Sequence, residues 1–143
     1  MMSISKKEIS IYIEIIYSVL FILIFMPYFY EIRLETIDFN AISKNIIQII
    51  SFSVIYFSST YIFLEVKYKG EIITDERDDM INSKAYKLGY ILLDLGIIIV
   101  LGHLLSNHSL YKNNGFIIFL ILTLLLSVSL IKSLFQLYLY RTS

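Results

Sequence analysis

The sequence predicts an all-α protein, an integral membrane four-helix bundle built from two transmembrane hairpins. Of 143 residues, 57% are hydrophobic and only 17% are charged, which is more apolar than an average soluble domain. The apolar residues are gathered into four blocks, each about as long as the hydrocarbon core of a bilayer is thick. We therefore expect one transmembrane domain over residues 1–143, with spans at about 9–30, 46–64, 88–105 and 116–140.

The first block, residues 9–30, follows Lys6 and Lys7, as the apolar part of a secretory signal would. It is some 22 residues long and is not followed by a small-residue cleavage site, so a retained span is the better interpretation. Pro27 lies in the last turns of this span. Because proline lacks a backbone N–H, we expect Pro27 to kink or end the helix there.

The remaining blocks complete the two hairpins. The third is the weakest, since its uncharged run after Asp94 covers only Leu95–Leu105, but an odd number of spans would leave one hairpin unpaired. Small residues at Ala85, Gly89 and Gly96 recur at helical spacing and should let another helix approach closely. Asp94 does not lie on this small-residue face.

The basic residues predict the orientation, because lysine and arginine near span ends resist translocation. Nine lie in or near the two ends of the chain and the connecting segment 65–87, and three lie in the other two loops. We therefore expect both termini and segment 65–87 to face the cytoplasm, in a multi-pass membrane protein. The nine are Lys6, Lys7, Lys67, Lys69, Arg77, Lys84, Lys87, Lys132 and Arg141, and the three are Arg33, Lys44 and Lys112.

Segment 65–87 contains five consecutive charged residues, Asp75, Glu76, Arg77, Asp78 and Asp79. Thr74 or Asp75 can cap a helix here, and carboxylates in a first turn oppose the positive end of its dipole, each contributing about 0.3–1 kcal/mol.

None of these five charges has an opposite charge three or four residues away. They are therefore either solvated or directed to another helix, another chain or a cation, although the order of acids does not match a calcium loop. We expect Arg77 to bond a carboxylate elsewhere in the bundle or in a second copy, and the run to help hold the two hairpins together.

The same stretch carries a resemblance. The pattern Asp-Glu-Arg-Asp, then Ile81, then Lys84-Ala85, then Gly89-Tyr90 at the entry to a span resembles a group of small prokaryotic membrane proteins. These proteins have four spans, with such a charged segment between two hairpins. The resemblance implies the topology of the whole chain and a location in a prokaryotic cytoplasmic (inner) membrane, and it implies no activity. It directs attention to Asp75, Glu76, Arg77, Asp78 and Lys84.

Three ionisable residues lie within the predicted spans: Glu14, Asp94 and Lys132. Asp94 is seven residues beyond Lys87, hence about 10 Å deep, and Lys132 lies about as deep in the fourth span. Because a charge inside the membrane requires a partner, we expect Asp94 and Lys132 to interact. Such a pair is either structural or part of a proton or ion relay, and Glu14 adds a carboxylate to the same half of the bundle.

Several kinds of chemistry are disfavoured. The chain contains no cysteine, which excludes disulfides and thiolate sites, and His103 and His108 are five residues apart, which does not place them on one helical face. There is no nucleophile elbow, metalloprotease helix or phosphate-binding glycine loop. We therefore expect no enzyme activity, no metal and no cofactor, and a net charge of zero argues against nucleic-acid binding.

Two functions remain open. The favoured hypothesis is a non-catalytic accessory, regulatory or immunity-like membrane component, whose cytoplasmic segment contacts a membrane-protein partner or a second copy. The alternative is a small transporter or channel component that uses Asp94, Lys132 and Glu14 along a polar path. The first is favoured because the spans hold few polar groups, and because four spans rarely enclose a solute path without oligomerising.

Overall fold

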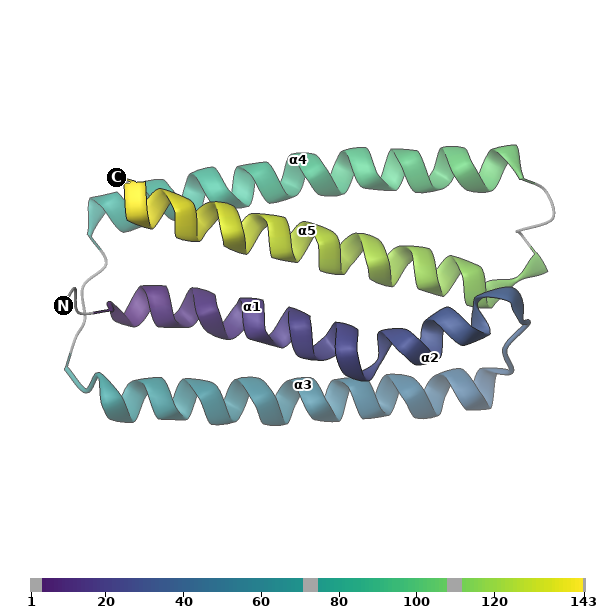
Figure 1. Cartoon of the computed structure of the whole chain (residues 1–143), viewed down its shortest axis with the longest axis horizontal. Helices are drawn as coiled ribbons and strands as arrows, with labels where there is room; N and C mark the ends of the chain where they lie inside the picture. Colours follow the sequence, from purple (N-terminus) through teal and green to yellow (C-terminus); the bar gives the residue numbers. More distant parts are fainter. Residues whose placement is uncertain (1–3, 71–74, 108–111, 143) are drawn as a thin grey trace.

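The computed structural model describes residues 4–70, 75–107 and 112–142, which are almost entirely helical. The all-α fold class is confirmed, and the helices form a bundle (Figure 1). The elements are α1 (Lys6–Ile24), α2 (Met26–Glu31), a 3-10 turn η1 (Ile32–Leu34), α3 (Phe39–Lys67), α4 (Glu76–Ser106) and α5 (Asn114–Thr142).

The helices follow one another in the order α4, α5, α1 with α2, and α3 (Figure 1). The second hairpin therefore meets the first through α5 and α1, while α4 and α3 lie at the two edges of the row. Both described ends of the chain, the end of α3 and the start of α4 lie at the same end of the molecule, which we call the terminal end (Figure 1). This arrangement agrees with the predicted pair of hairpins.

Helix α1 begins at a capping box and ends at a bend. The Ser5 hydroxyl accepts a hydrogen bond from the Glu8 amide, and the Glu8 carboxylate accepts one from the Ser5 amide, each at 3.2 Å. Helix α2 then restarts with Pro27 in its first turn, and the chain bends by 46° between α1 and the segment formed by α2 and η1. The predicted kink at Pro27 is confirmed, because the missing proline N–H cannot continue the α1 ladder.

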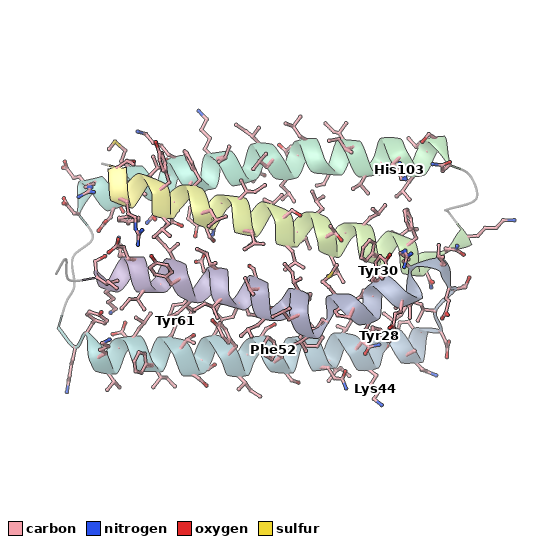
Figure 2. All side chains as sticks on the ribbon, in the orientation of Figure 1. Tyr28, Tyr30, Lys44, Phe52, Tyr61 and His103 are labelled. Carbon is pink, nitrogen blue, oxygen red and sulfur yellow. The ribbon has the colours of Figure 1, made fainter. Side chains whose placement is uncertain are left out.

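The first hairpin is joined by aromatic side chains. Tyr17 of α1 packs against Phe52 and Phe57 of α3, with ring centroids 6.0 and 4.6 Å apart, and its hydroxyl bonds the Ser53 hydroxyl at 2.6 Å. The Tyr56 hydroxyl donates to the Ile13 carbonyl at 2.8 Å. These contacts use one side of α3, and its outer side, on which Lys44 points away from the bundle, is exposed (Figure 2).

The second hairpin is joined by small residues. Ala85 and Gly89 of α4 are buried, and a Cβ atom added at Gly96 would lie 2.0 Å from a methyl group of Leu124 in α5. The small-residue face predicted from Ala85, Gly89 and Gly96 is therefore the face on which α4 packs against α5.

At the end opposite the terminal end, the start of α5 is fastened to the segment between η1 and α3. The Asn114 side chain accepts from the Ile37 amide at 2.7 Å and donates to the Ile37 carbonyl at 2.8 Å. Gly115 lies so close to η1 that an added Cβ would stand 2.3 Å from the Ile32 carbonyl oxygen. The two hairpins are thus in direct backbone contact at this end.

Helices α3, α4 and α5 are each long and apolar enough to cross a membrane, and the bent pair of α1 with α2 and η1 is a fourth candidate if it counts as one span. Each of the three exceeds its predicted apolar block, and α4 includes most of the charged run, which therefore forms the first turns of a helix. The predicted sidedness, with the terminal end in the cytoplasm, stays a prediction.

We predict that Gly115→Ala destabilises the fold, whereas Gly102→Ala does not. The added methyl at position 115 meets backbone oxygen, which can move only if the helix moves, and should cost about 1–3 kcal/mol. Gly102 has open space around it within α4, so alanine there should be neutral or stabilising by up to about 1 kcal/mol. Thermal unfolding in detergent measures both, and equal melting temperatures for the two variants would contradict the close contact between α5 and η1.

Candidate functional site

Polar side chains concentrate at the terminal end of the bundle, around the first turn of α1. The adjacent residues Lys6 and Lys7 diverge, since consecutive helical positions point in different directions. Lys6 pairs with Glu65 near the end of α3 at 2.6 Å, and Lys7 pairs with Asp78 in the first turn of α4 at 3.1 Å. One turn of α1 is therefore linked to both edge helices of the row.

The start of α4 explains why acidic residues open this helix. Asp75 is the N-cap residue, as predicted, and the Asp78 carboxylate accepts a hydrogen bond from the Asp75 amide at 3.3 Å, the reciprocal arm of a capping box. Thr74, the other predicted cap, lies outside the described residues. Asp78 therefore satisfies a free amide of its own helix and pairs with Lys7 of the other hairpin, and the charged run joins the two hairpins as predicted.

The environment of Asp78 stabilises its charge. Burial raises the pKa of its carboxyl, but Lys7, the nearby Tyr140 hydroxyl and the Asp75 amide together hold the pKa below its usual value. The Tyr140 hydroxyl is buried beside the carboxylate, although the two do not meet with ordinary hydrogen-bond geometry. Because the folded pKa is below the unfolded value of about 3.9, Asp78 stabilises the fold above that pH, and the contribution is lost as the pH falls through the folded pKa.

Within the described residues, Arg77 does not bond a carboxylate of the bundle, and a carboxylate of a second copy stays a prediction. The Arg77 guanidinium donates to the backbone carbonyl of Tyr140 at 3.0 Å, near the end of α5. The last carbonyls of a helix have no partner within the helix and lie at the negative end of its dipole, so an arginine is well placed there. Arg77 thus joins α4 to α5 within the second hairpin.

Three further charged residues near the start of α4 face outward. Glu76, Asp79 and Lys84 are exposed, and none of them forms an ion pair or a side-chain hydrogen bond with another described residue. Met80 lies among them and is 50% exposed. We call Glu76, Asp79, Met80 and Lys84 the outer patch.

Inside the predicted spans, Lys132 pairs with Glu14, and the predicted Asp94–Lys132 pair is wrong. Lys132 and Ser133 of α5 both donate to one carboxylate oxygen of Glu14 in α1, at 2.9 and 3.1 Å. The Lys132 side chain runs along Gly89 and places its ammonium 4.8 Å from the centre of the Tyr86 ring. Gly89 lies on the face of α4 that meets α5, whereas Asp94 is exposed and forms no hydrogen bond or ion pair with the described residues.

Some polar contacts were not predicted. The buried Gln136 amide in α5 donates to the Asn82 side chain in α4, and Arg141 donates to the Tyr12 hydroxyl in α1. Gln136 could have been found, because an amide within an apolar span requires a partner. The Tyr12 contact leaves no comparable signal, since tyrosines are frequent near all the predicted span ends.

Within the described parts of the chain, no three histidine or acidic side chains come together as a metal-binding group. His103 is exposed and packs beside the Phe116 ring, with ring centres 6.1 Å apart, and His108 lies outside the described residues. The chemistry available at the terminal end is therefore that of paired and exposed charges. Such groups can fasten helices together and can be recognised by another protein.

A comparison of the chain with protein families, curated proteins and solved structures finds no match to any of them. The fold and the site define a helical bundle with three or four helices able to cross a membrane. The resemblance of residues 75–90 to small prokaryotic four-span proteins stays a prediction.

We predict that Glu14 and Lys132 are energetically coupled and that Asp94 and Lys132 are not. Lys132→Met leaves Glu14 half-buried without its cation and should cost about 2–4 kcal/mol, and adding Glu14→Gln should recover part of the loss. In the control cycle, Asp94→Asn and Lys132→Met should be additive, because the two side chains do not meet. Unfolding in detergent measures both cycles, and additivity in the Glu14 cycle would contradict the observed pair.

Proposed function

We propose that the protein is a non-catalytic, four-pass component of a prokaryotic cytoplasmic membrane, with accessory, regulatory or immunity-like action through binding. The outer patch, at the start of α4, contacts a membrane-protein partner or a second copy of the chain. Three apolar helices and the bent α1–α2 pair support the membrane location. The terminal end carries most of the basic residues, which supports a cytoplasmic location for this end.

The single observation that carries the proposal is the division of the charged segment into two faces. Asp78 and Arg77 are engaged by the bundle, and the outer patch presents both signs of charge around an exposed methionine. Glu76, Asp79 and Lys84 form no side-chain hydrogen bond or ion pair with the described residues. A charged surface with a flexible apolar centre is suited to recognition by a protein.

The transporter alternative receives less support from the geometry. Glu14 and Lys132 neutralise each other between α1 and α5, whereas Asp94 lies on the outer face of α4. The three side chains do not line one path within a single copy of the chain. An enzyme is also less well supported, because the carboxylates within the bundle are already paired with lysines.

We predict four membrane crossings with both termini in the cytoplasm. Reporter fusions at Asn40, Lys69 and Asn113 measure this topology. Position 69 should report the cytoplasm and positions 40 and 113 the opposite side. A cytoplasmic signal at Asn40 or Asn113 would overturn the orientation.

We predict that neutralising the outer patch impairs association without unfolding the protein. The combined variant Glu76→Gln, Asp79→Asn and Lys84→Gln should keep its melting temperature, since these side chains bond no other described residue. It should lose the co-purifying membrane protein or change its oligomeric state. Asp78→Asn is the matched control: it should lower stability by about 1–2 kcal/mol through loss of the Lys7 pair and the cap contact, and keep association below its melting temperature. Unchanged association in the combined variant would refute the role of the outer patch.

A further inference from the structure

Both edges of the helix row carry polar side chains on outer faces that are mostly apolar. On α4, Asp94 is exposed between Tyr90 and Ile98, which are exposed as well. On α3, Gln48 and Ser51 are exposed among isoleucines and valine, and Ser58 follows two turns further along the same face. Among the described residues, the side chains of Asp94, Gln48 and Ser51 form no hydrogen bond or ion pair.

These groups lie deep within helices that are candidate spans. Asp94 is seven residues from Lys87 and twelve from Ser106, hence about 10 and about 18 Å from the two ends of that stretch of α4. A carboxylate at such a depth is costly in lipid and is expected to face protein or water. Serine and glutamine in spans likewise tend to hydrogen-bond another helix.

The polar groups on the two edges lie at matching depth. Lys6 and Lys7 are consecutive, so their partners Glu65 in α3 and Asp78 in α4 mark the same level of the bundle. Asp94 is 16 residues beyond Asp78, or about 24 Å along α4. Ser51 and Gln48 precede Glu65 by 14 and 17 residues, or about 21 and about 26 Å along α3, which brackets the depth of Asp94.

We propose that copies of this chain associate head to tail in the membrane, with the outer face of α4 in one copy packed against the outer face of α3 in the next. The Asp94 carboxylate accepts hydrogen bonds from Gln48 and Ser51 of the neighbouring copy. Because all copies cross the membrane in the same direction, equal depth within one chain brings these groups together between chains. The inference rests on the proposed membrane location and is independent of the outer patch.

Symmetric pairing of identical faces fits these charges less well. A two-fold contact through α4 would bring Asp94 against Asp94 and Lys87 against Lys87, because Lys87 lies two turns from Asp94 on the same face. A two-fold contact through α3 would leave Asp94 in lipid. The head-to-tail contact uses two different faces, so each copy can bind a further copy. The copies form a closed ring if the rotation from one copy to the next brings the last copy against the first.

Cysteine cross-linking in native membranes tests this inference, because the chain has no cysteine of its own. Ile98→Cys on α4 and Ile47→Cys on α3 lie at nearly equal depth, and the native side chains are 65% and 63% exposed. When two differently tagged chains carrying one substitution each are co-expressed and oxidised with copper phenanthroline, we expect a dimer bearing both tags. A chain carrying both substitutions should give a ladder of trimers and larger species.

A matched control replaces Ile47→Cys by Ile62→Cys, which is equally exposed on α3 but lies about 22 Å away along the helix. This pair should yield at least fivefold less of the mixed dimer. Adding Asp94→Leu to the Ile98→Cys chain should lower the yield of the matched pair, because the carboxylate is then lost to its donors.

Two outcomes would overturn the inference. The first is a dimer of the Ile98→Cys chain alone, which would show a symmetric α4 contact. The second is that no mixed dimer forms, although the chains fractionate with the membrane and keep the wild-type melting temperature. This outcome overturns the inference whether or not the chains cross-link to another membrane protein. A chain absent from the membrane fraction would instead refute the membrane location, so failure of the proposed function is distinguishable from failure of this inference.

Discussion

The pair formed by Glu14 and Lys132 joins the two hairpins, and the order of the helices depends on it. Glu14 belongs to α1 and receives hydrogen bonds from both Lys132 and Ser133 of α5, while the stem of Lys132 lies against Gly89 of α4. Lipid chains are as apolar as leucine, so apolar burial alone does not select a neighbour for a helix within a membrane. A charge pair does, because a carboxylate or an ammonium left alone there is costly. The observed arrangement, with α1 beside α5, satisfies both side chains.

Polar pairs also join the helices at the terminal end, where the groups are more exposed. The first two turns of α1 contact all three of the other long helices. Lys6 pairs with Glu65 of α3, Lys7 pairs with Asp78 of α4, and Tyr12 accepts a hydrogen bond from Arg141 of α5. Exposed pairs contribute little individually, and Glu65 is largely exposed, but a set of pairs that share one helix fixes the relative heights of four helices. Four of the basic residues that predict a cytoplasmic terminal end also bind the helix ends together, namely Lys6, Lys7, Arg77 and Arg141.

Local properties of the sequence predicted much of the fold. The apolar blocks, the kink at Pro27, the cap at Asp75 and the small-residue face of α4 each depend on a few neighbouring residues, so no knowledge of the other helices was needed. The pairing of Lys132 with Asp94 was predicted wrongly, and Arg77 bonds a backbone carbonyl where a carboxylate of the bundle was expected. The depth of a residue gives only one coordinate of its side chain, and the rotation of the helix gives another. Asp94 is five residues beyond Gly89, a rotation of about 140°, so the two cannot both face α5. The fastening of Ile37 by Asn114 depends on two loops that meet only in the folded chain.

The polar residues of this chain divide into those that the bundle satisfies and those that it leaves for other molecules. Glu14, Lys132, Asp78 and Arg77 are satisfied within one copy, and their removal should be felt as instability. The outer patch, Asp94 and the exposed amide and hydroxyls of α3 are not satisfied by any described residue. At the terminal end, water can solvate such groups at little cost in free energy, so a partner can bind there and dissociate again. In the proposed membrane location, water is absent around the spans and the free-energy cost of an unsatisfied group persists, so the bilayer favours association of the edge helices.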